Sequence, residues 1–315
     1  MHCAIMADIW VLCRAELVSC RMQMNTTDNK HVAPVGPQEY RRAVFIGESF
    51  LEIPFNGQCV HEPVAGGVLL RAACEVSRRG IQTDFVSETG RDCVGDIILS
   101  QLESCGVGSR SVDVFTEGSS ATHLLFDLPQ NTVAYGTYPA EDMSVIWPRI
   151  DVDSVVVYGG TYVLEPRVSG QVAEILRYAR DRRAMVVYVP DFSPWLAHRI
   201  TRYMPVILDN LENSDLIVTC NSDLKLLFGC ENAEQAFKER VGFHADRMLN
   251  IADERIEMFG LQGMSASVAG NFSRMPEVLG AIAETLALSS INHETIAMTT
   301  TDALNAFVSE IAARM

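Results

Sequence analysis

The stretch Glu88-Thr-Gly-Arg-Asp-Cys-Val-Gly95, continued through Leu102 to Gly106-Val107, carries the most information about the fold. It combines a G-x-D-x-x-G spacing, an apolar helical run and a closing Gly-Val pair. The places of this pattern are filled by Gly90, Asp92, Gly95, Leu102, Gly106 and Val107. Glycines at fixed spacing mark positions where the backbone turns tightly or approaches another group closely.

Strands and helices alternate along the chain on both sides of this stretch, from Ala43 onward. Buried strands are expected at residues 43–46, 83–87, 154–158, 185–189 and 215–219, and helices at 67–79, 167–182 and 195–211. This order is typical of a parallel sheet that helices cover on both faces. Because right-handed crossovers place successive strands in one sheet, the sequence predicts a three-layer α/β/α fold with a mostly parallel central sheet.

A strand-rich patch interrupts the alternation. Residues 112–115 and 121–127 alternate polar and apolar side chains without a helix between them, so they are expected to be antiparallel strands. Together with strands at about 52–62, the segment 111–138 is predicted to form a small antiparallel β lid. A lid sheet has open edges and one apolar face, which a second copy of the chain would cover, so a homodimer through the lid is expected.

Composition limits the classes of partner. The chain has 315 residues, 48% of them hydrophobic, and a formal net charge of -15. That length favours one large α/β domain, assigned to residues 41–315. The net charge argues against nucleic acid or an anionic membrane as a partner. Nine cysteines without a C-x-x-C motif or a zinc-type spacing indicate free thiols in a reducing, cytoplasmic compartment and no metal site.

Residues 1–40 differ from the rest and are expected to be an N-terminal arm outside the fold, either disordered or not translated. The apolar stretch 4–13 is broken by Asp8 and followed by Arg14 and Glu16, which spoils a signal-peptide core. Met24 opens a polar run, so translation can start at Met1 or at Met24.

The motifs described above resemble those of the ribokinase-like, or PfkB, carbohydrate kinases. The resemblance covers residues 43 to about 290 and is specific in its first half and weaker in its last third. It implies the ribokinase-like fold, a sugar pocket beside the 88–107 segment and a lid that covers the sugar and often forms a dimer interface. It also implies ATP and magnesium as cofactors, with transfer of the γ-phosphate to a substrate hydroxyl.

The sugar-binding positions of that family are only partly kept. In segment 47–52, Glu52 stands where the family usually has aspartate. Its extra methylene displaces the carboxylate oxygens by more than ~1 Å. Gly66 and Gly67 keep the two glycines at a helix start, whereas the family asparagine falls on Arg71. Arginine donates but accepts no hydrogen bonds, so it cannot replace the amide. Glu52 is either a displaced sugar ligand or a solvated lid residue; Arg71 belongs either to a solvated helix face or to a pocket for an acidic ligand.

The resemblance also implies a magnesium and phosphate side. Segment 189–195 partly matches the family signature D-P-N-x-R-P followed by tryptophan. In this segment Val189 replaces the aspartate and Ser193 replaces the arginine. Segment 220–223 aligns with the N-x-x-E motif and leaves Asp223 as its carboxylate. Because the second carboxylate of the motif is missing, Asp223 is better explained as an acid at a helix N-terminus, where the helix dipole stabilises it.

The catalytic G-A-G-D motif is the most altered. In the family, amides at a helix N-terminus form an anion hole and the aspartate takes the proton from the attacking hydroxyl. The best match is Val268-Ala269-Gly270-Asn271-Phe272, so Val268, Ala269 and Gly270 are a remnant of the anion hole. Asn271 at the base position cannot accept a proton at neutral pH. Pro276 predicts that the helix begins later, within 273–277, and the next acid, Glu277, lies six residues beyond Asn271.

The nucleotide loop has changed as well, because segment 247–253 occupies its place with no glycine before Gly260. Three interpretations follow. The first is a PfkB homologue with impaired or absent catalysis, a pseudokinase that binds a small sugar-like ligand or a partner protein and for which no cofactor is assigned. The second is an active ATP- and magnesium-dependent sugar or nucleoside kinase. The third is a structural dimer without a ligand, which would show a filled pocket between Glu52 and Arg71.

Overall fold

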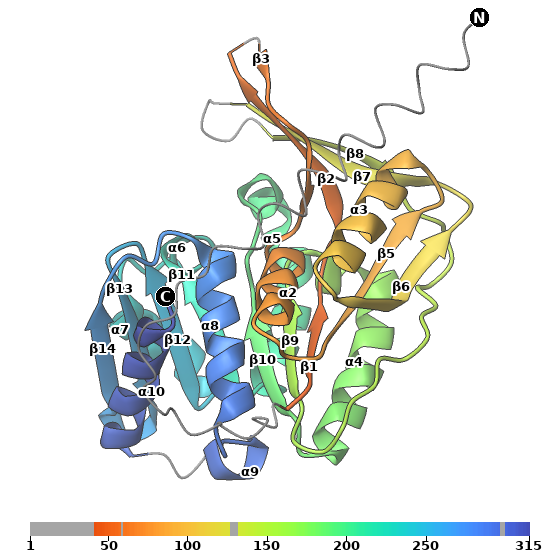
Figure 1. Cartoon of the computed structure of the whole chain (residues 1–315). Coiled ribbons are helices and arrows are strands. Elements are labelled where there is room, and N and C mark those ends of the chain that lie inside the picture. The colour runs from red at the N-terminus through yellow and green to blue at the C-terminus, as the bar shows by residue number, and fades with distance from the viewer. Residues whose placement is uncertain (1–40, 58, 127–131, 297–299) are drawn as a thin grey trace, which may run out of the picture. The chain divides into compact units, whose positions relative to one another are not determined.

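A nine-stranded sheet lies at the centre of the computed structural model, which describes residues 41–57, 59–126, 132–296 and 300–315 (Figure 1). The strand order is β14-β13-β12-β11-β10-β9-β1-β5-β6. The bounds are β1 (Ala43–Ile46), β5 (Thr83–Gly90), β6 (Gly108–Phe115), β9 (Val155–Gly159), β10 (Met185–Val189), β11 (Leu216–Cys220), β12 (Arg247–Ala252), β13 (Arg255–Gly260) and β14 (Ser265–Ala269). Strands from β6 across to β12 are parallel, whereas β13 and β14 add to the edge in antiparallel pairs.

Helices cover both faces of this sheet. One face carries α2 (Val68–Arg78), α3 (Cys93–Ser104), α8 (Met275–Leu288) and α10 (Thr301–Ala313). The other carries α4 (Pro166–Asp181), α5 (Ile200–Glu212), α6 (Asn221–Phe228) and α7 (Ala233–Glu239). Short helices are α9 (His293–Ile296), η1 (Tyr162–Leu164), η2 (Pro194–Arg199), η3 (Val241–Phe243) and η4 (Leu261–Gly263). The predicted three-layer, mostly parallel fold class is confirmed.

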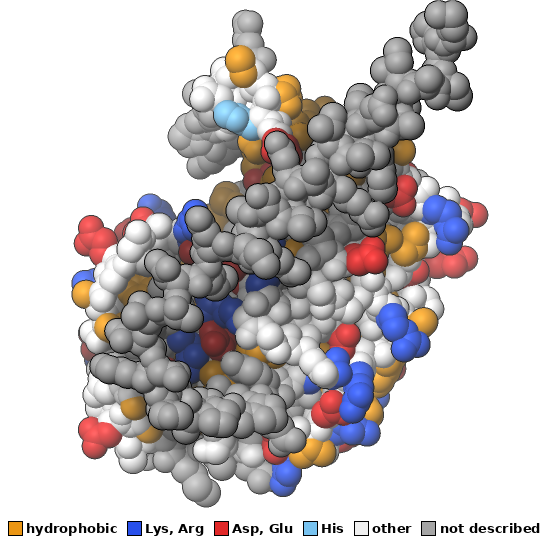
Figure 2. Space-filling model, viewed as in Figure 1, with side chains coloured by type: hydrophobic (Ala, Val, Ile, Leu, Met, Phe, Trp, Pro, Cys, Tyr) orange, Lys and Arg blue, Asp and Glu red, His pale blue; other side chains and the backbone are white. Residues whose placement is uncertain are grey.

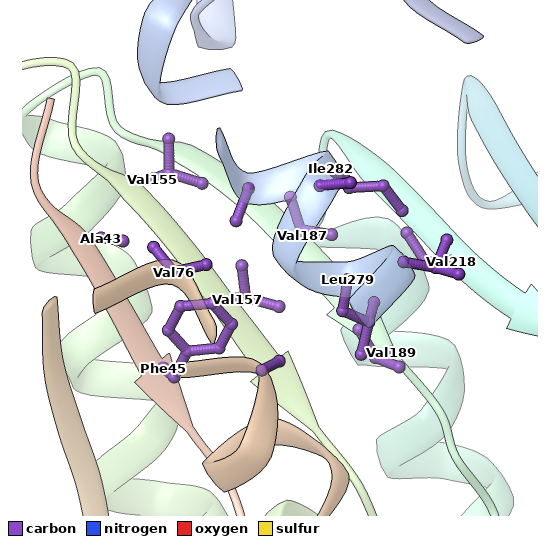
Figure 3. Close-up of a cluster of buried hydrophobic side chains, with 14 of the residues drawn as sticks. Ala43, Phe45, Val76, Val155, Val157, Val187, Val189, Val218, Leu279 and Ile282 are labelled. Carbon is purple, nitrogen blue, oxygen red and sulfur yellow. The ribbon is translucent and has the colours of Figure 1, made fainter. Parts of the chain in front are cut away.

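The two layers form because successive side chains of a strand point to opposite faces. Phe45 belongs to the core beneath α2 and α8, whereas its neighbour Val44 belongs to the core beneath α4 and α5. Figure 3 shows Phe45 beside Val76 of α2, with Leu279 of α8 over the neighbouring strands. Continuous apolar strands such as β1 and β10 are therefore buried on both faces.

A smaller sheet projects from one end of the main sheet and corresponds to the predicted lid (Figure 1). It contains β2 (Phe50–Asn56), β3 (Cys59–Val60), β4 (Val64–Gly66), β7 (Ser119–Leu125) and β8 (Thr132–Thr137). The pairs β2–β3, β2–β4 and β7–β8 are antiparallel, and β2–β7 is parallel. Residues 58 and 127–131 of the predicted lid and the predicted arm 1–40 lie outside the described residues.

The start of the predicted second lid segment needs a correction. Residues 111–115 form part of β6, which pairs in parallel with β5 at the edge of the main sheet. The helix α3 connects β5 to β6 as a crossover, and Val112 and Phe115 of β6 are both buried. Alternation of polar and apolar residues identifies a strand but does not say which sheet it joins.

Within these described ranges, no helix is long and apolar enough to cross a membrane.

Candidate functional site

The G-x-D-x-x-G segment joins the lid to the main sheet. Asp92 caps α3 by accepting a hydrogen bond from the Gly95 amide at 2.9 Å, and it also accepts bonds from the amide and hydroxyl of Ser120 at 2.8 and 2.7 Å. Partial burial raises the pKa of Asp92, but the amides of Ser120 and Gly95 outweigh it, so the pKa lies below its ordinary value. A Cβ at Gly95 would lie 2.1 Å from the carbonyl oxygen of Gly90, so only glycine fits there. The motif therefore fixes lid strand β7 beside the start of α3.

Glu52 of β2 and Arg71 of α2 form an ion pair. The Glu52 side chain is 17% exposed and that of Arg71 39% exposed. Both predicted sugar-side residues are thus brought together, and each neutralises the other. This ion pair spans the space between the two residues, where a sugar pocket was expected from the sequence.

Gly66 and Gly67 lie where α2 begins, as predicted, with Gly67 at the N-cap and a φ of 110°. A Cβ at Gly66 would lie 2.3 Å from the ring of Phe50, and one at Gly67 would lie 2.3 Å from the carbonyl oxygen of Glu48. These glycines make room for the chain's own groups at this turn.

A cleft of about 430 Å³ opens beside the lid. Lid strands β2, β7 and β8 line it together with the ends of β1 and β5, η1 and the start of α4. Its charged and aromatic lining includes Glu48, Phe50, Glu88, His123, Tyr138 and Arg167. Sequence reasoning missed these residues. One signal was available in the sequence. Glu48 lies two residues after β1 and Glu88 lies two residues before the end of β5, and the carboxyl ends of parallel strands form ligand sites in α/β folds.

Glu88 is the most buried acid in this lining, at 2% exposed. Its Oε1 is ion-paired with Arg167, whereas its Oε2 has no hydrogen-bond partner among the described residues. Burial raises the pKa of Glu88 to about 7; Arg167 opposes the shift and Asp113 adds to it. Arg167 also makes a cation–π contact with Tyr138, with 5.0 Å between the guanidinium carbon and the centre of the ring.

Glu48 in the cleft lining interacts electrostatically with a second acid, Asp191. Glu48 Oε2 accepts a hydrogen bond from Thr161 Oγ1 at 3.0 Å, and burial raises the pKa of Glu48 despite that bond. Asp191 follows β10 with a left-handed φ of 38°. Burial, with repulsion from Glu48 and Asp223, raises the pKa of Asp191 to about 8. The carboxyl groups therefore hold protons at higher pH than free acids do.

His123 of β7 stacks on Phe50, with ring centroids 3.8 Å apart and planes at 20°. Burial lowers the pKa of His123 to about 4, so the ring is neutral at pH 7. The stack supplies an apolar wall to the cleft.

Asp223 lies in the first turn of α6 and is 1% exposed. It accepts hydrogen bonds from the amides of Phe192 at 2.9 Å and Cys220 at 3.2 Å. The interpretation as a helix N-terminal acid therefore agrees with its contacts. Among the residues that the structure describes, no three His, Cys, Asp or Glu side chains gather as metal ligands.

The predicted anion-hole remnant lies on a strand end. Val268 and Ala269 end β14, and the Gly270 amide donates to the carbonyl of Glu254 at 2.9 Å. The Phe272 amide donates to the Asp253 carbonyl at 2.8 Å. Both amides are therefore engaged by the turn between β12 and β13.

The base position and the next helix follow this turn. Asn271 Oδ1 accepts a hydrogen bond from Ser273 Oγ at 2.8 Å. Helix α8 begins at Met275 with Pro276 in its first turn, which confirms the predicted later start. Glu277 is ion-paired with Arg274 at the wall of a separate cavity of about 630 Å³ that Arg71 also lines.

Comparison with known proteins agrees with this architecture. Residues 61–246 match the pfkB family carbohydrate kinases, so the chain has a ribokinase-like fold and belongs to the PfkB family of carbohydrate kinases. The matched range ends just before β12.

Solved structures share the fold at low sequence identity. Fructokinase with bound ATP from Xylella fastidiosa is 15% identical, with a TM-score of 0.68 over 87% of this chain and 92% of that one. Aminoimidazole riboside kinase from Salmonella enterica is 14% identical, with a TM-score of 0.70 over 87% and 92%. A PfkB protein from Polaromonas sp. JS666 is 14% identical, with a TM-score of 0.64 over 86% and 94%.

Proposed function

We propose that this chain is a PfkB homologue with impaired or absent phosphotransfer that binds a small polar ligand in the cleft beside its lid. The observation that carries the proposal is the engagement of the Gly270 and Phe272 amides by backbone carbonyls, next to an asparagine at the base position. Loss of a general base alone lowers a rate by ~10² to 10⁴. Loss of amides aimed at the developing charge adds to that deficit.

The cleft supports the ligand-binding half of the proposal. Its volume of about 430 Å³ is at the small end of the range for ligand pockets, and its walls combine aromatic rings with carboxyl groups. The similar structures include fructokinases and an aminoimidazole riboside kinase, which supports a sugar-like ligand.

The test is a phosphotransfer assay with magnesium-ATP over a panel of hexoses, pentoses and nucleosides, read by the phosphorylated product in mass spectrometry. We expect no product above the level of a boiled control. Stoichiometric, magnesium-dependent phosphorylation of any substrate would contradict this proposal and show that the chain is an active sugar or nucleoside kinase, the second interpretation.

A homodimer through the lid is a second proposal, and it does not require a ligand. Hydrophobic side chains are exposed on the projecting lid (Figure 2), among them Val60 at 57%, Val133 at 41% and Tyr135 at 60% exposed. The bridged gap between Glu52 and Arg71 favours a structural role for this region. A second copy would cover both the apolar face and the edge strand β8.

Light scattering at tens of micromolar tests the dimer. We expect twice the chain mass for the wild type and the single-chain mass for Tyr135→Lys. Phe243→Lys is the matched control, because Phe243 is also exposed, at 77%, but lies outside the lid. A monomeric wild type would rule out this proposal.

A further inference from the structure

We propose that Glu88 makes the cleft selective for small polyhydroxyl compounds that carry an amine, and that the cleft rejects anionic sugars. The inference rests on the proposed function, because it names the ligand class of the same cleft. It starts from Glu88 Oε2, an acceptor in a side chain that is 2% exposed and lines the cleft, and which has no hydrogen-bond partner among the described residues.

Leaving a buried acceptor unpaired destabilises the protein, and more so when the acceptor is charged. Buried polar groups in folded proteins are nearly always hydrogen-bonded. Oε2 itself is closed off from solvent, so a ligand in the cleft offsets that destabilisation through the charge of its donor group rather than by direct contact with Oε2. Glu88 therefore selects for a positively charged donor at this end of the cleft.

The charges of the lining decide which donor fits best. Three carboxyl groups, those of Glu48, Glu88 and Glu165, line the cleft beside one guanidinium, that of Arg167. Arg167 is already ion-paired with Glu88 Oε1 and donates to the carbonyl of Glu141 at 3.1 Å. An anionic ligand would be repelled by each of these acids that is ionised, whereas an ammonium group would attract them and favour their ionised form.

The remaining carboxyls define the rest of the ligand. Glu48 Oε2 accepts a hydrogen bond from Thr161 Oγ1 at 3.0 Å, and the backbone amides of Thr161 and Tyr162 also bond to this carboxyl. Glu165 Oε1 accepts a hydrogen bond from Tyr203 Oη at 2.9 Å, and the rest of this carboxyl has capacity for further donors, which sugar hydroxyls provide. The Phe50–His123 stack offers an apolar wall for a sugar ring. The combination fits an amino sugar better than a sugar acid or a sugar phosphate.

Isothermal titration calorimetry at pH 7 without nucleotide tests this inference. The probes are D-glucosamine, D-mannosamine and D-galactosamine, each against its parent hexose, with D-gluconate as the anionic probe. We expect at least one amino sugar to bind about tenfold or more tightly than its parent hexose, and gluconate not to bind. Glu88→Gln should remove that preference, because the amide keeps the shape but not the charge. Glu103→Gln on the exposed side of α3 is the matched control and should bind like the wild type.

The inference is overturned if gluconate or a parent hexose binds as tightly as the amino sugars, if Glu88→Gln keeps the preference, or if none of the probes binds. Binding of a hexose without a preference for the amine would leave the proposed function standing. Conversely, magnesium-dependent phosphorylation of a bound amino sugar would contradict the proposed function and leave the role of Glu88 intact.

Discussion

Arg71 of α2 forms an ion pair with Glu52 of β2, although the two residues stand where the family resemblance places two separate sugar ligands. The extra methylene of Glu52 and the long arginine side chain allow the acid and the base to meet. Restoring the family asparagine at position 71 alone would leave Glu52 without its ion-pair partner, so these two positions must be considered together.

A double-mutant cycle measures this pair. Glu52→Gln, Arg71→Gln and the double variant are expected to give a coupling of about 0.3 to 1 kcal/mol in urea unfolding, the range for partly exposed pairs. The Glu234–Lys238 pair, with side chains 62% and 63% exposed, is the control and should couple less strongly. Strictly additive effects at Glu52 and Arg71 would show that the pair does not exist in solution.

Asp223 is expected to stabilise the folded chain through its hydrogen bonds to two backbone amides. Asp223→Ala leaves the buried amides of Phe192 and Cys220 without their acceptor, which lowers the free energy of unfolding by about 2 kcal/mol. Asp96→Ala, in the exposed first turn of α3, is the control and should cost about 0.5 kcal/mol or less. Urea unfolding of the three proteins checks this. Equal effects of the two substitutions would contradict the assignment.

Glu88 predicts a pH dependence of stability. Its pKa is about 7 in the folded chain against 4.5 as the ordinary value, so the folded state binds more protons between these limits. The stability from this group is therefore fully present below about pH 4.5, falls as the pH rises to about 7, and is level above it. The full change is on the order of 3 kcal/mol, from a pKa shift to about 7 from 4.5.

Comparison of the wild type with Glu88→Gln isolates the part of the pH dependence of stability that comes from Glu88. Since glutamine does not titrate, the wild type should lose stability relative to Glu88→Gln between pH 4.5 and 7. Arg167, Asp113, Tyr138, Tyr162 and Glu48 are the charged or titratable groups around Glu88, and the substitution keeps all of them. Thermal unfolding at several pH values gives the difference. A constant difference over this window would show that Glu88 is ionised throughout.

Asn271→Asp is expected not to restore phosphotransfer. The substitution supplies a carboxylate at the base position, but the Gly270 and Phe272 amides still donate to Glu254 and Asp253. A circular dichroism spectrum like that of the wild type would show that the variant is folded. Product formation by Asn271→Asp in the mass-spectrometric assay would mean that the base alone was missing.

The alternation of strands and helices was sufficient to predict the layers of this fold. Apolar runs such as 43–46 and 185–189 can be satisfied only by burial on both faces, so their role follows from composition. The β6 strand could not be assigned, because period-2 alternation is the same at the edge of a large sheet and in a lid. Strands β13 and β14 were not predicted, since the segment from Arg255 onward was interpreted only through the altered nucleotide motif.

The site was less predictable than the fold. Glu52 and Arg71 were identified as sugar-side positions, but their sequence separation says nothing of their ion pair. Glu48 and Glu88 were visible in the quoted motifs, yet the cleft forms only where the ends of β1 and β5 meet the lid. Orientation of side chains at strand ends depends on these tertiary contacts, which no local pattern encodes.

The most direct test of the central claim is a titration with magnesium-ATP. A ligand at about 100 times its dissociation constant stabilises a protein by about 2.7 kcal/mol. For a chain of this size, that raises the melting temperature by about a couple of degrees or more. Because the Gly270 and Phe272 amides are engaged, millimolar magnesium-ATP is expected to give no saturable rise in melting temperature. A saturable rise, with a dissociation constant in the micromolar range by calorimetry, would contradict the account and make the active kinase the better interpretation.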